Sequence, residues 1–421
     1  MNIILTPSHP HGRIKAIASK SAAHRLLICA AFARGKTTLC CEETNEDINA
    51  TVNCLNSLGA NIIRRGSDFT VSPIEKLNTN ATLNCRESGS TLRFLLPVTC
   101  FLGANASFKM AGRLPERPLS PLREELERCG ITFSPAGSDP LVCKGKVTDT
   151  QFSIPGNVSS QFISGLLFAI AISGRTGTVR IIGKLESEPY INMTLNALNA
   201  FGVKVERTSE GYSVTENNGL LSPVSAFVEG DWSNAAFPLA MGAIGNAPIT
   251  VCGIFENSAQ GDKRIVSLLR EFGAKVCFED NNVTVSPAEL HGIEIDASQI
   301  PDLVPILATV ASVANGKTVI YNAERLRIKE SDRLHTVSTM LNALGADVTE
   351  TEGGLIINGV SRLTGGSTSS FGDHRIAMSA AVASTVCDSD VYIENAGAAS
   401  KSYPGFWKDI GSLGVKITET K

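Results

Sequence analysis

Charged and hydroxyl-bearing residues recur at one kind of place in this sequence, immediately before a long apolar segment. The first example is residues 20–25, which read KSAAHR, and the second is residues 87–93, which read ESGSTLR. Arginine matches the planar oxygens of carboxylates and phosphates, lysine acts as a point charge, and hydroxyls and backbone amides donate hydrogen bonds to the same anions. The pattern therefore predicts a site for one or two small molecules that carry several phosphate and carboxylate groups.

Each of these polar segments is predicted to open a helix, and we expect Ser21 to cap the first one. Lys20 and Arg25 then lie where the helix dipole disfavours cations unless an anion binds there. A solvated basic helix end is the alternative. Further polar helix starts are expected at residues 158–161, 229–234, 300–302 and 372–375, and polar loops at residues 112–118, 186–190, 327–333 and 401–404. If the helices of a group point the same way, their starts converge on a strongly positive cleft.

A repeat predicts the elements that carry these residues. A bulky residue or cysteine, a glycine, a small or branched residue, any residue and an apolar residue recur six times, as in FGAKV at residues 272–276. The glycines are Gly59, Gly130, Gly202, Gly273, Gly345 and Gly414, with separations of 71, 72, 71, 72 and 69 residues. Amphipathic segments precede them at residues 52–58, 122–129, 193–201, 265–272, 337–344 and 406–413. Each repeat therefore predicts a surface helix, a left-handed glycine at its C-cap, and a strand.

A second helix is predicted between consecutive glycines, and it is apolar on nearly all sides, which is typical of a buried helix. Its copies are residues 21–33, 90–102, 160–172, 234–244, 303–314 and 375–386. One unit is thus buried helix, strand, loop, surface helix, glycine and strand. Six units around two cores predict two domains of three units each, an α/β architecture with mixed sheets. Residues 1–18 are expected to form a strand and a turn.

The composition is that of an ordinary globular protein. The chain has 421 residues, of which 43% are hydrophobic and 19% charged, and its net charge of −3 favours neither nucleic acid nor an anionic membrane as a partner. No apolar run is long enough to span a bilayer, and the first residues lack the core of a signal peptide. None of the eleven cysteines forms a Cys-x-x-Cys pair, so we expect reduced, packed thiols in a cytoplasmic protein. No phosphate-binding loop or Rossmann glycine motif indicates a nucleotide.

Five motifs, in their order along the chain, resemble those of the 5-enolpyruvylshikimate-3-phosphate (EPSP) synthase family. They are residues 20–25 (KSAAHR), 89–93 (GSTLR), 159–161 (SSQ), 329–333 (KESDR) and 373–375 (DHR). The resemblance covers essentially the full length. It implies the two-domain inverse α/β barrel of the enolpyruvyl transferases, with six βαβαββ units, three per domain. It also implies that residues 1–18 and 229–421 form one domain and that residues 19–228 form the other.

The resemblance implies two substrates, shikimate 3-phosphate and phosphoenolpyruvate, and neither a metal nor an organic cofactor. The positions matching the shikimate 3-phosphate site are Lys20, Ser21, Arg25, Ser159, Ser160, Gln161, Ser187, Tyr190, Asp302 and Lys329. Those matching the phosphoenolpyruvate site are Lys20, Gly89, Arg117, Gln161, Arg333, Arg375 and Lys401. We expect a monomer that binds neither nucleic acid nor membrane.

The implied chemistry is addition followed by elimination of phosphate. A base must remove the proton of the attacking ring hydroxyl, and an acid must protonate the methylene carbon of phosphoenolpyruvate. Asp302 is the candidate base, and Glu330 together with Lys20 supplies the candidate acid. Without the resemblance, Asp302 reads as a helix cap, and Glu330 reads as an ion-pair partner of Arg333 three residues further along a helix.

Three positions depart from the family pattern. Glu87 and Arg325 stand where members carry asparagine, and Phe94 stands where others carry proline. The carboxylate of Glu87 puts a direct contact with a substrate anion in doubt. Gly89 is kept, so we expect millimolar glyphosate to inhibit the enzyme, because a side chain at this position would crowd the inhibitor.

Two rival functions are considered. The sister enzyme that transfers enolpyruvyl to UDP-N-acetylglucosamine resembles this chain in fold, but it carries asparagine where Ser21 stands, and it uses a loop cysteine as the acid. A DNA clamp is also built from repeated α/β units, but it lines its hole with basic helix faces. Here the cations gather at helix starts and the helices are apolar.

Overall fold

A computed structural model describes residues 1–420, and its helices follow the predicted repeat. The apolar helices are α1 (Lys20–Phe32), α3 (Gly89–Leu102), α5 (Ser160–Ile172), α7 (Trp232–Ile244), α9 (Val304–Ala311) and α11 (His374–Ser384). The helices that precede a repeat glycine are α2 (Glu46–Leu58), α4 (Leu122–Arg128), α6 (Glu188–Ala200), α8 (Ile265–Phe272), α10 (Arg333–Ala343) and α12 (Phe406–Ser412). Short 3-10 helices are η1 (Leu114–Glu116), η2 (Gly261–Arg264), η3 (Pro301–Leu303), η4 (Glu324–Ile328) and η5 (Ala396–Lys401). These positions confirm the six predicted pairs of helices.

All six repeat glycines follow their helices with a positive φ, from 84° at Gly202 to 117° at Gly59, as predicted. Gly59 and Gly273 are themselves the C-caps, whereas each of the other four lies one residue beyond the C-cap. At Gly59 a side chain would also collide with the Lys76 carbonyl oxygen, 2.5 Å from the Cβ position. The helix starts differ more from the prediction. For example, α2 begins before residue 52, because the Asn45 side chain accepts a hydrogen bond from the Ile48 amide at 2.9 Å and caps an additional turn.

The strands form six four-stranded sheets with one common pattern, a parallel pair followed by two antiparallel pairs. Three sheets have the orders β14 (Ser225–Phe227), β3 (Thr37–Cys40), β5 (Asp68–Ser72), β4 (Asn61–Arg65); β6 (Thr82–Arg86), β7 (Ser107–Met110), β9 (Leu141–Lys144), β8 (Thr132–Phe133); and β10 (Gln151–Pro155), β11 (Gly177–Ile182), β13 (Gly211–Val214), β12 (Glu206–Thr208). The other three are β2 (Gly12–Lys15), β15 (Ile249–Cys252), β17 (Asn282–Ser286), β16 (Lys275–Glu279); β18 (Glu294–Asp296), β19 (Lys317–Tyr321), β21 (Gly354–Asn358), β20 (Asp347–Thr351); and β22 (Gly366–Ser369), β23 (Val391–Glu394), β1 (Asn2–Thr6), β24 (Lys416–Thr420). The repetition confirms the six-unit α/β architecture.

The first residues were expected to form a single strand and a turn, and this prediction is wrong. They form two strands in different sheets: β1 lies between β23 and β24, and β2 pairs in parallel with β15. Conversely, β14 pairs with β3, which lies far earlier in the sequence. The first two strands of the chain thus complete sheets whose other strands come much later in the sequence, and β14 completes a sheet whose other strands come much earlier. Such non-local pairings cannot be read from local periodicity, because they depend on which sheet offers an open edge.

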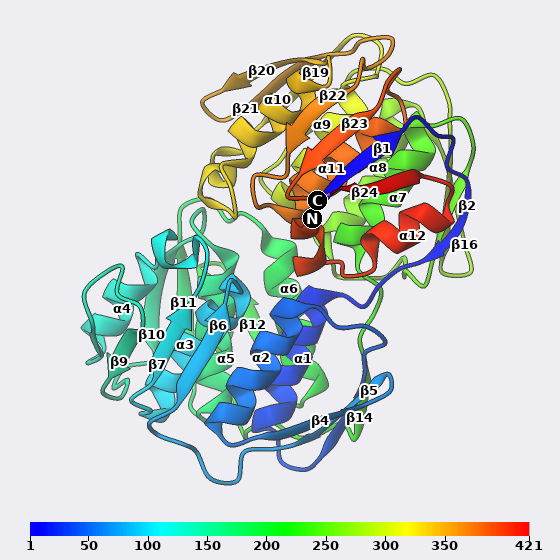
Figure 1. The fold of residues 1–421 in the computed structure, drawn as a ribbon. Helices are drawn as coiled ribbons and strands as arrows, with labels where there is room; N and C mark the ends of the chain where they lie inside the picture. Colours follow the sequence, from blue (N-terminus) through cyan, green and yellow to red (C-terminus); the bar gives the residue numbers. More distant parts are fainter. Residues whose placement is uncertain (421) are drawn as a thin grey trace. The chain divides into compact units, whose positions relative to one another are not determined.

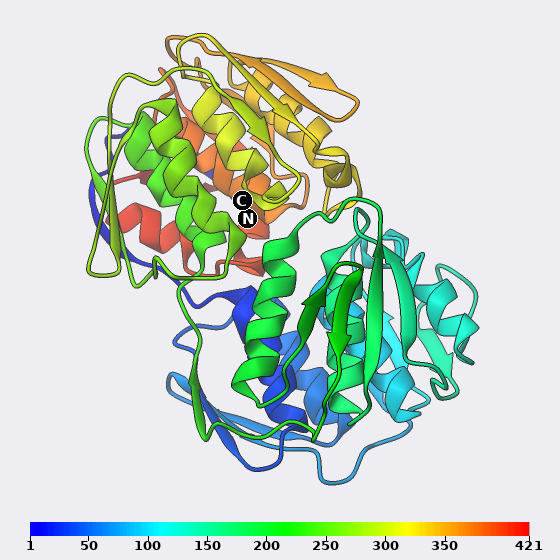
Figure 2. The ribbon, with the colours of Figure 1, turned by 180° about the vertical axis from the view of Figure 1, so that it is seen from behind.

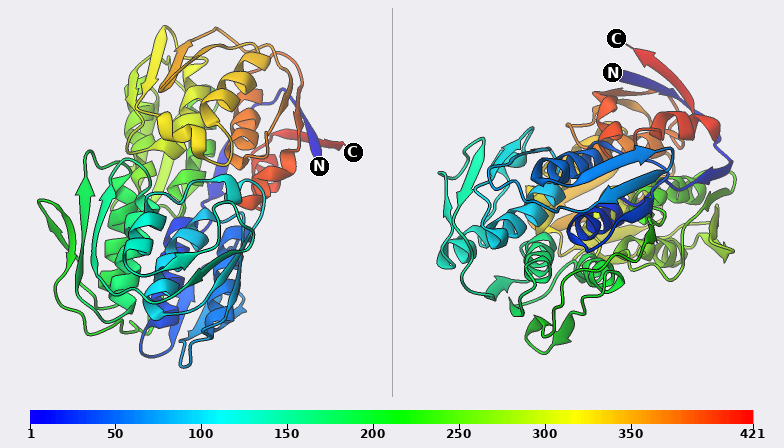
Figure 3. Two further views of the ribbon diagram at one scale, coloured as in Figure 1. Left: turned by 90° about the vertical axis from the view of Figure 1, so that its left-hand side faces the viewer. Right: turned by 90° about the horizontal axis from the view of Figure 1, so that it is seen from below.

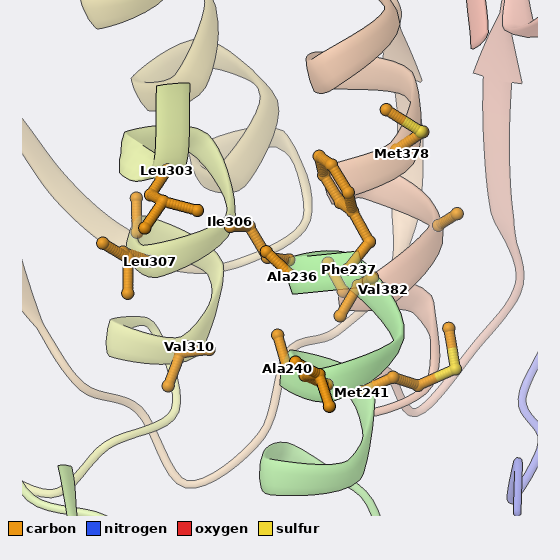
Figure 4. Close-up of a cluster of buried hydrophobic side chains, with 14 of the residues drawn as sticks. Ala236, Phe237, Ala240, Met241, Leu303, Ile306, Leu307, Val310, Met378 and Val382 are labelled. Carbon is orange, nitrogen blue, oxygen red and sulfur yellow. The ribbon is translucent and has the colours of Figure 1, made fainter. Parts of the chain in front are cut away.

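The chain divides into two compact units, which are described separately. Unit 1 consists of Met1–Ile17 and Glu229–Lys421, and unit 2 of Ala18–Val228. In each unit three apolar helices occupy the interior and the sheets lie outside them, as Figures 1 and 2 show from opposite sides and Figure 3 from two further directions. In unit 1, Figure 4 shows buried side chains of α7, α9 and α11 that belong to one core, including Phe237, Ile306 and Met378.

Two features that the composition predicted can be checked. The eleven cysteines are all free thiols, eight of them buried, which confirms the expected packed thiols. Within residues 1–420, no helix is both long and apolar enough to cross a membrane.

Gly165 on α5 packs tightly against the backbone of α3, the neighbouring buried helix of unit 2. A methyl group there would overlap the Arg93 carbonyl oxygen and lie 2.9 Å from Pro97 Cγ on α3. We predict that Gly165→Ala lowers the free energy of unfolding by about 1–3 kcal/mol, because the two helix backbones must separate. Urea unfolding followed by circular dichroism measures this. Gly411→Ala is the control, since its methyl group would meet only Ile417 Cδ1 at 3.7 Å; equal losses in both variants would contradict the prediction.

Candidate active site

In unit 1 a single buried guanidinium, that of Arg333, holds three carboxylates. The side chain is 1% exposed. Its Nη1 donates to Asp302 Oδ1 at 2.8 Å, its Nη2 to Glu330 Oε2 at 2.7 Å, and its Nε to Asp373 Oδ2 at 2.8 Å. The candidate base and the candidate acid are therefore positioned by the same planar group.

The starts of three helices supply these residues. Asp302 lies in η3, which leads into α9, and Arg333 is the first residue of α10. Asp373 caps α11 by accepting a hydrogen bond from the Arg375 amide at 2.9 Å. Within unit 1 the structure thus brings the predicted polar helix starts together.

Arg375 joins a fourth helix start to this group. Its Nη1 donates to the Asp302 carbonyl oxygen at 3.0 Å, and its Nη2 donates to Ser233 Oγ, in the first turn of α7, at 2.7 Å. Lys329 Nζ lies 3.8 Å from Asp302 Oδ1. Lys401 is adjacent, because its Nζ donates to the carbonyl oxygen of Gly372, next to the cap of α11, at 3.0 Å. All six predicted site residues of unit 1 therefore lie in one neighbourhood.

Burial and charge shift the pKa values in this group in opposite directions. Burial raises the pKa of Asp302, but Arg375, Lys329 and Arg333 outweigh it and hold that pKa well below its usual range. Burial lowers the pKa of Lys329 to about 8, although Asp302 opposes the shift. Burial, with the nearby charge of Asp302, raises the pKa of a further carboxyl, Asp262, to about 6.

Carboxylates are interleaved with the cations around Arg333. Three carboxylates, those of Asp302, Glu330 and Asp373, accompany the cations Arg333, Arg375 and Lys329. A buried guanidinium needs counter-charges, and these carboxylates supply them. The alternative interpretation of Glu330 is also correct in part: it does pair with Arg333, although it lies before α10 rather than on it. Asp302 makes no side-chain cap.

In unit 2 the start of α1 differs from the prediction. The cap is Ser19, whose Oγ accepts a hydrogen bond from the Ala22 amide at 3.3 Å, so Ser21 lies inside the helix and does not cap it. Lys20 Nζ pairs with Asp47 Oδ2 at 2.9 Å, and both side chains are about one-fifth exposed. An acidic residue on α2 thus stabilises the cation that the helix dipole disfavours.

Arg25 is buried, and each of its three side-chain nitrogens donates a hydrogen bond to the protein. Its Nη1 donates to the Ser21 carbonyl oxygen at 2.6 Å, its Nη2 to that of Tyr190 at 2.8 Å, and its Nε to Thr194 Oγ1 at 2.9 Å. Burial lowers the pKa of Arg25 to about 10. The guanidinium also lies 5.0 Å from the centre of the Phe94 ring, which is fully buried. Arg25 therefore ties α1 to α6, and the departure at Phe94 belongs to the core.

The starts of α3 and α5 meet through Gln161. Its Nε2 donates to Ser90 Oγ at 2.9 Å, and its Oε1 accepts from Arg93 Nη1 at 3.0 Å. A Cβ on Gly89 would lie 2.7 Å from Arg93 Nη1 and 3.1 Å from Arg117 Nη1. The structure thus brings Gly89, Arg117 and Gln161 together, and the absence of a side chain at Gly89 leaves room for two guanidinium groups.

The remaining predicted residues of unit 2 lie at two helix starts. Ser159 caps α5, its Oγ accepting from the Gln161 amide at 3.3 Å, and the next residue, Ser160, is buried. Ser187 precedes α6 with a left-handed φ of 55°, and Tyr190 lies in the first turn. Glu87, one of the three departures from the family pattern, packs against the loop at Gly112. A Cβ added to Gly112 would lie 2.6 Å from Glu87 Cδ.

Sequence reasoning missed four residues of these groups. Arg93 and Asp373 stand inside quoted motifs, so their position could have indicated them. Asp47 pairs with Lys20 across 27 residues, and Asp262 reaches the Arg333 group from η2; neither had a sequence signal. Such partners are defined by the tertiary fold alone.

His24, directly before Arg25, is fully buried. Burial, together with Lys20 and Arg25 and against the effect of Asp47, lowers its pKa to about 3, whereas an unfolded chain keeps a histidine pKa of about 6.5. Between these values only the unfolded chain binds the proton. The contribution of His24 to stability is therefore complete above the unfolded pKa and is lost as the pH falls below it.

We predict that acidification from about pH 6.5 to about pH 5 removes about 2 kcal/mol from the free energy of unfolding through His24, at about 1.4 kcal/mol per pH unit. Urea unfolding of the wild type and of His24→Asn at both pH values isolates this contribution, because asparagine does not titrate. An identical pH-dependent loss in the two proteins would show that His24 does not carry it.

Comparisons with known proteins agree along the chain. The family model described as EPSP synthase (3-phosphoshikimate 1-carboxyvinyltransferase) matches residues 5–410. The 3-phosphoshikimate 1-carboxyvinyltransferase of Clostridium perfringens strain 13 is 41% identical over 421 residues, covering 99% of each chain. That of Clostridium kluyveri is 40% identical over 419 residues, covering 99% of this chain and 98% of the relative. The EPSP synthase structure from Acinetobacter baumannii, at 23% identity, covers 100% of both chains with a TM-score of 0.84, which confirms the enolpyruvyl transferase fold. The chain therefore belongs to the EPSP synthase (3-phosphoshikimate 1-carboxyvinyltransferase) family.

Proposed function

We propose residue roles for the reaction of this family. The chain transfers the enolpyruvyl group of phosphoenolpyruvate to the 5-hydroxyl of shikimate 3-phosphate and releases phosphate, a step of the shikimate pathway toward chorismate and the aromatic amino acids. The observation that carries this function is the family match over residues 5–410, together with about 40% identity over nearly the whole chain. The roles of individual residues rest on the motifs and on the geometry of each unit.

From unit 1 we assign Asp302 and Lys329 to shikimate 3-phosphate, and Arg333, Arg375 and Lys401 to phosphoenolpyruvate. The support is their common neighbourhood, since each lies within hydrogen-bond or ion-pair distance of the Arg333 group or of the cap of α11. Arginines suit the carboxylate and phosphate of phosphoenolpyruvate, because their forks bind two oxygens at once.

From unit 2 we assign residues at the starts of α1, α5 and α6 to shikimate 3-phosphate, and residues around α3 to phosphoenolpyruvate. The first set is Lys20, Ser21, Arg25, Ser159, Ser160, Gln161, Ser187 and Tyr190. The second set is Lys20, Gly89, Arg117 and Gln161. Arg25 is the least direct of these, because each of its three nitrogens already donates a hydrogen bond to the protein, including one to the Tyr190 carbonyl oxygen.

We assign Asp302 as the base that takes the proton of the 5-hydroxyl when its oxygen attacks C2 of phosphoenolpyruvate. A carboxylate whose pKa is held well below its usual range is a weak base, and three cations hold Asp302 in that state. Anionic substrates that bind Arg333, Arg375 and Lys329 would neutralise those cations. The pKa of Asp302 then rises toward the working range, so substrate binding itself activates the base.

We assign Glu330, with Lys20, to protonation of the C3 methylene. Carbon–oxygen bond formation at C2 and proton addition at C3 produce a tetrahedral intermediate. The same pair, now deprotonated, then takes a proton from C3, which restores the double bond while the phosphate leaves C2. Glu330 Oε2 is held by Arg333 at 2.7 Å and its side chain is 29% exposed, so it combines a fixed position with access to ligand.

We also propose that the chain is a cytoplasmic monomer. It needs no cofactor and binds neither nucleic acid nor membrane, since its two substrates are small anions. The family match decides against UDP-N-acetylglucosamine as the acceptor, and the enolpyruvyl transferase fold decides against a DNA clamp.

We predict that Asp302→Asn lowers kcat about 10²–10⁴-fold, the usual value of a positioned base. A phosphate-release assay with both substrates measures it. Asp347→Asn is the matched control, because this exposed carboxylate on β20 contacts Asn358 Nδ2 at 2.9 Å, away from the Arg333 group. Full activity in Asp302→Asn would remove Asp302 from the role of base.

We predict that Gly89→Ala raises the KM for phosphoenolpyruvate and weakens inhibition by glyphosate, each by about tenfold or more. The added methyl group would lie 2.7 Å from Arg93 Nη1 and 3.1 Å from Arg117 Nη1, so at least one guanidinium must move. Steady-state kinetics with millimolar glyphosate test this. Unchanged values for both ligands would mean that neither binds near Gly89.

A further inference from the structure

His24 begins a chain of hydrogen bonds that crosses three helices of unit 2. Its Nδ1 lies 2.7 Å from Thr51 Oγ1 on α2, which lies 2.7 Å from Thr91 Oγ1 on α3. Thr91 Oγ1 donates to Ser88 Oγ, the cap of α3, at 2.7 Å. All four side chains are at most 1% exposed. Water is thus excluded from the chain, and its members must satisfy one another.

Each hydroxyl has only one hydrogen to donate, and this determines which atom is the donor in each hydrogen bond of the chain. Thr91 has one hydroxyl hydrogen and donates it to Ser88, so its contact with Thr51 must use the hydrogen of Thr51. Thr51 must then accept from His24, which places the imidazole hydrogen on Nδ1. His24 Nε2 is buried without a hydrogen-bond partner among residues 1–420, as suits a nitrogen that carries a lone pair and no hydrogen.

This chain ends at the residues that surround Gly89. Ser88 caps α3 by also accepting from the Thr91 amide at 3.3 Å, and Gly89 is the next residue. One residue further, Ser90 is held from the other side by Gln161. The start of α3 therefore lies between two hydrogen-bond networks, one of which begins at His24.

The neighbour of His24 makes a similar chain in another direction. Arg25 Nε donates to Thr194 Oγ1 on α6 at 2.9 Å, which donates to Ser164 Oγ on α5 at 2.8 Å. Two consecutive residues of α1 thus connect it, through α2 and α6, to the two other buried helices. Apolar packing alone allows helices to slide, whereas paired polar groups in a core favour one register.

We propose that His24, as the Nδ1–H tautomer, is a positioning residue that sets the start of α3 and thereby the affinity for phosphoenolpyruvate. The inference rests on the proposed assignment of Gly89 and Arg117 to that substrate. His24 itself contacts no substrate in this account. Loss of its hydrogen bond leaves Thr51 and Thr91 free to reorient, and Gly89 moves relative to Arg117.

The tautomer is tested without substrate. Long-range proton–nitrogen correlation spectra of the ¹⁵N-labelled full chain show which ring nitrogen carries the hydrogen, and the signals absent in His24→Asn identify His24 among the six histidines. We expect the hydrogen on Nδ1 at neutral pH. A hydrogen on Nε2 would overturn the proposed chain.

Kinetics test the positioning role. His24→Leu and Thr51→Val each remove a link, and we expect each to raise the KM for phosphoenolpyruvate about tenfold, with kcat and the KM for shikimate 3-phosphate changed less than about twofold. The double variant should be no worse than either single one, because one broken link opens the chain. His24→Asn should restore most of the affinity, since its amide N–H lies close to the place of Nδ1–H.

Thr99→Val is the matched control. It removes a buried hydroxyl of α3 that donates to the Leu96 carbonyl of the same helix at 2.9 Å, outside the chain. Folding of every variant is checked by thermal unfolding. A wild-type KM in a folded Thr51→Val or His24→Leu variant, or an equal rise in Thr99→Val, would overturn the positioning role. If the wild type showed no turnover, the proposed function would be refuted instead. The tautomer measurement would still test the hydrogen-bond chain that begins at His24.

Discussion

The buried guanidinium of Arg333 is the interaction on which the polar half of unit 1 depends. An arginine that is 1% exposed requires partners for its charge and for its hydrogens, and three carboxylates provide both. Because these carboxylates come from the starts of α9 and α11 and from the segment before α10, the same requirement draws those segments together. The charge pairing of Arg333 and the positions of the proposed catalytic residues Asp302 and Glu330 therefore depend on the same contacts.

The balance also shapes reactivity. The carboxylates of this group already pair with its cations, so an anion that bound Arg333 or Arg375 would take the place of a carboxylate partner. An exchange of this kind changes the pKa of Asp302 in the direction a base needs, since each neutralised cation raises it. In the proposed mechanism, the pairing that stabilises this group is thus also what holds Asp302 in a weakly basic state before substrate binds.

In unit 2 the polar residues at the helix starts find their partners with fewer charged groups. Lys20 pairs with the Asp47 carboxylate, while many other polar groups near the helix starts are hydroxyls, amides and arginines that donate to backbone or amide oxygens. Hydroxyl chains need no counter-ions, and they fix direction because each has only one hydrogen to donate. The repeated fold thus carries two kinds of polar interior: carboxylates shared by arginines in unit 1, and hydrogen-bond chains in unit 2.

The sequence by itself determined the repeat, the six pairs of helices, the left-handed glycines and the family motifs, because these depend on local periodicity and on residue types at fixed spacing. It placed Asp302, Glu330 and Arg333 in one expectation through the resemblance, but only the structure shows that Asp302, Glu330 and Asp373 share one guanidinium. Only the tertiary structure decided that β1 and β2 enter different sheets, that Ser19 and not Ser21 caps α1, and that Asp47 pairs with Lys20. These features join residues far apart in the chain or depend on which buried group lacks a partner, and that becomes known only when the helices have packed.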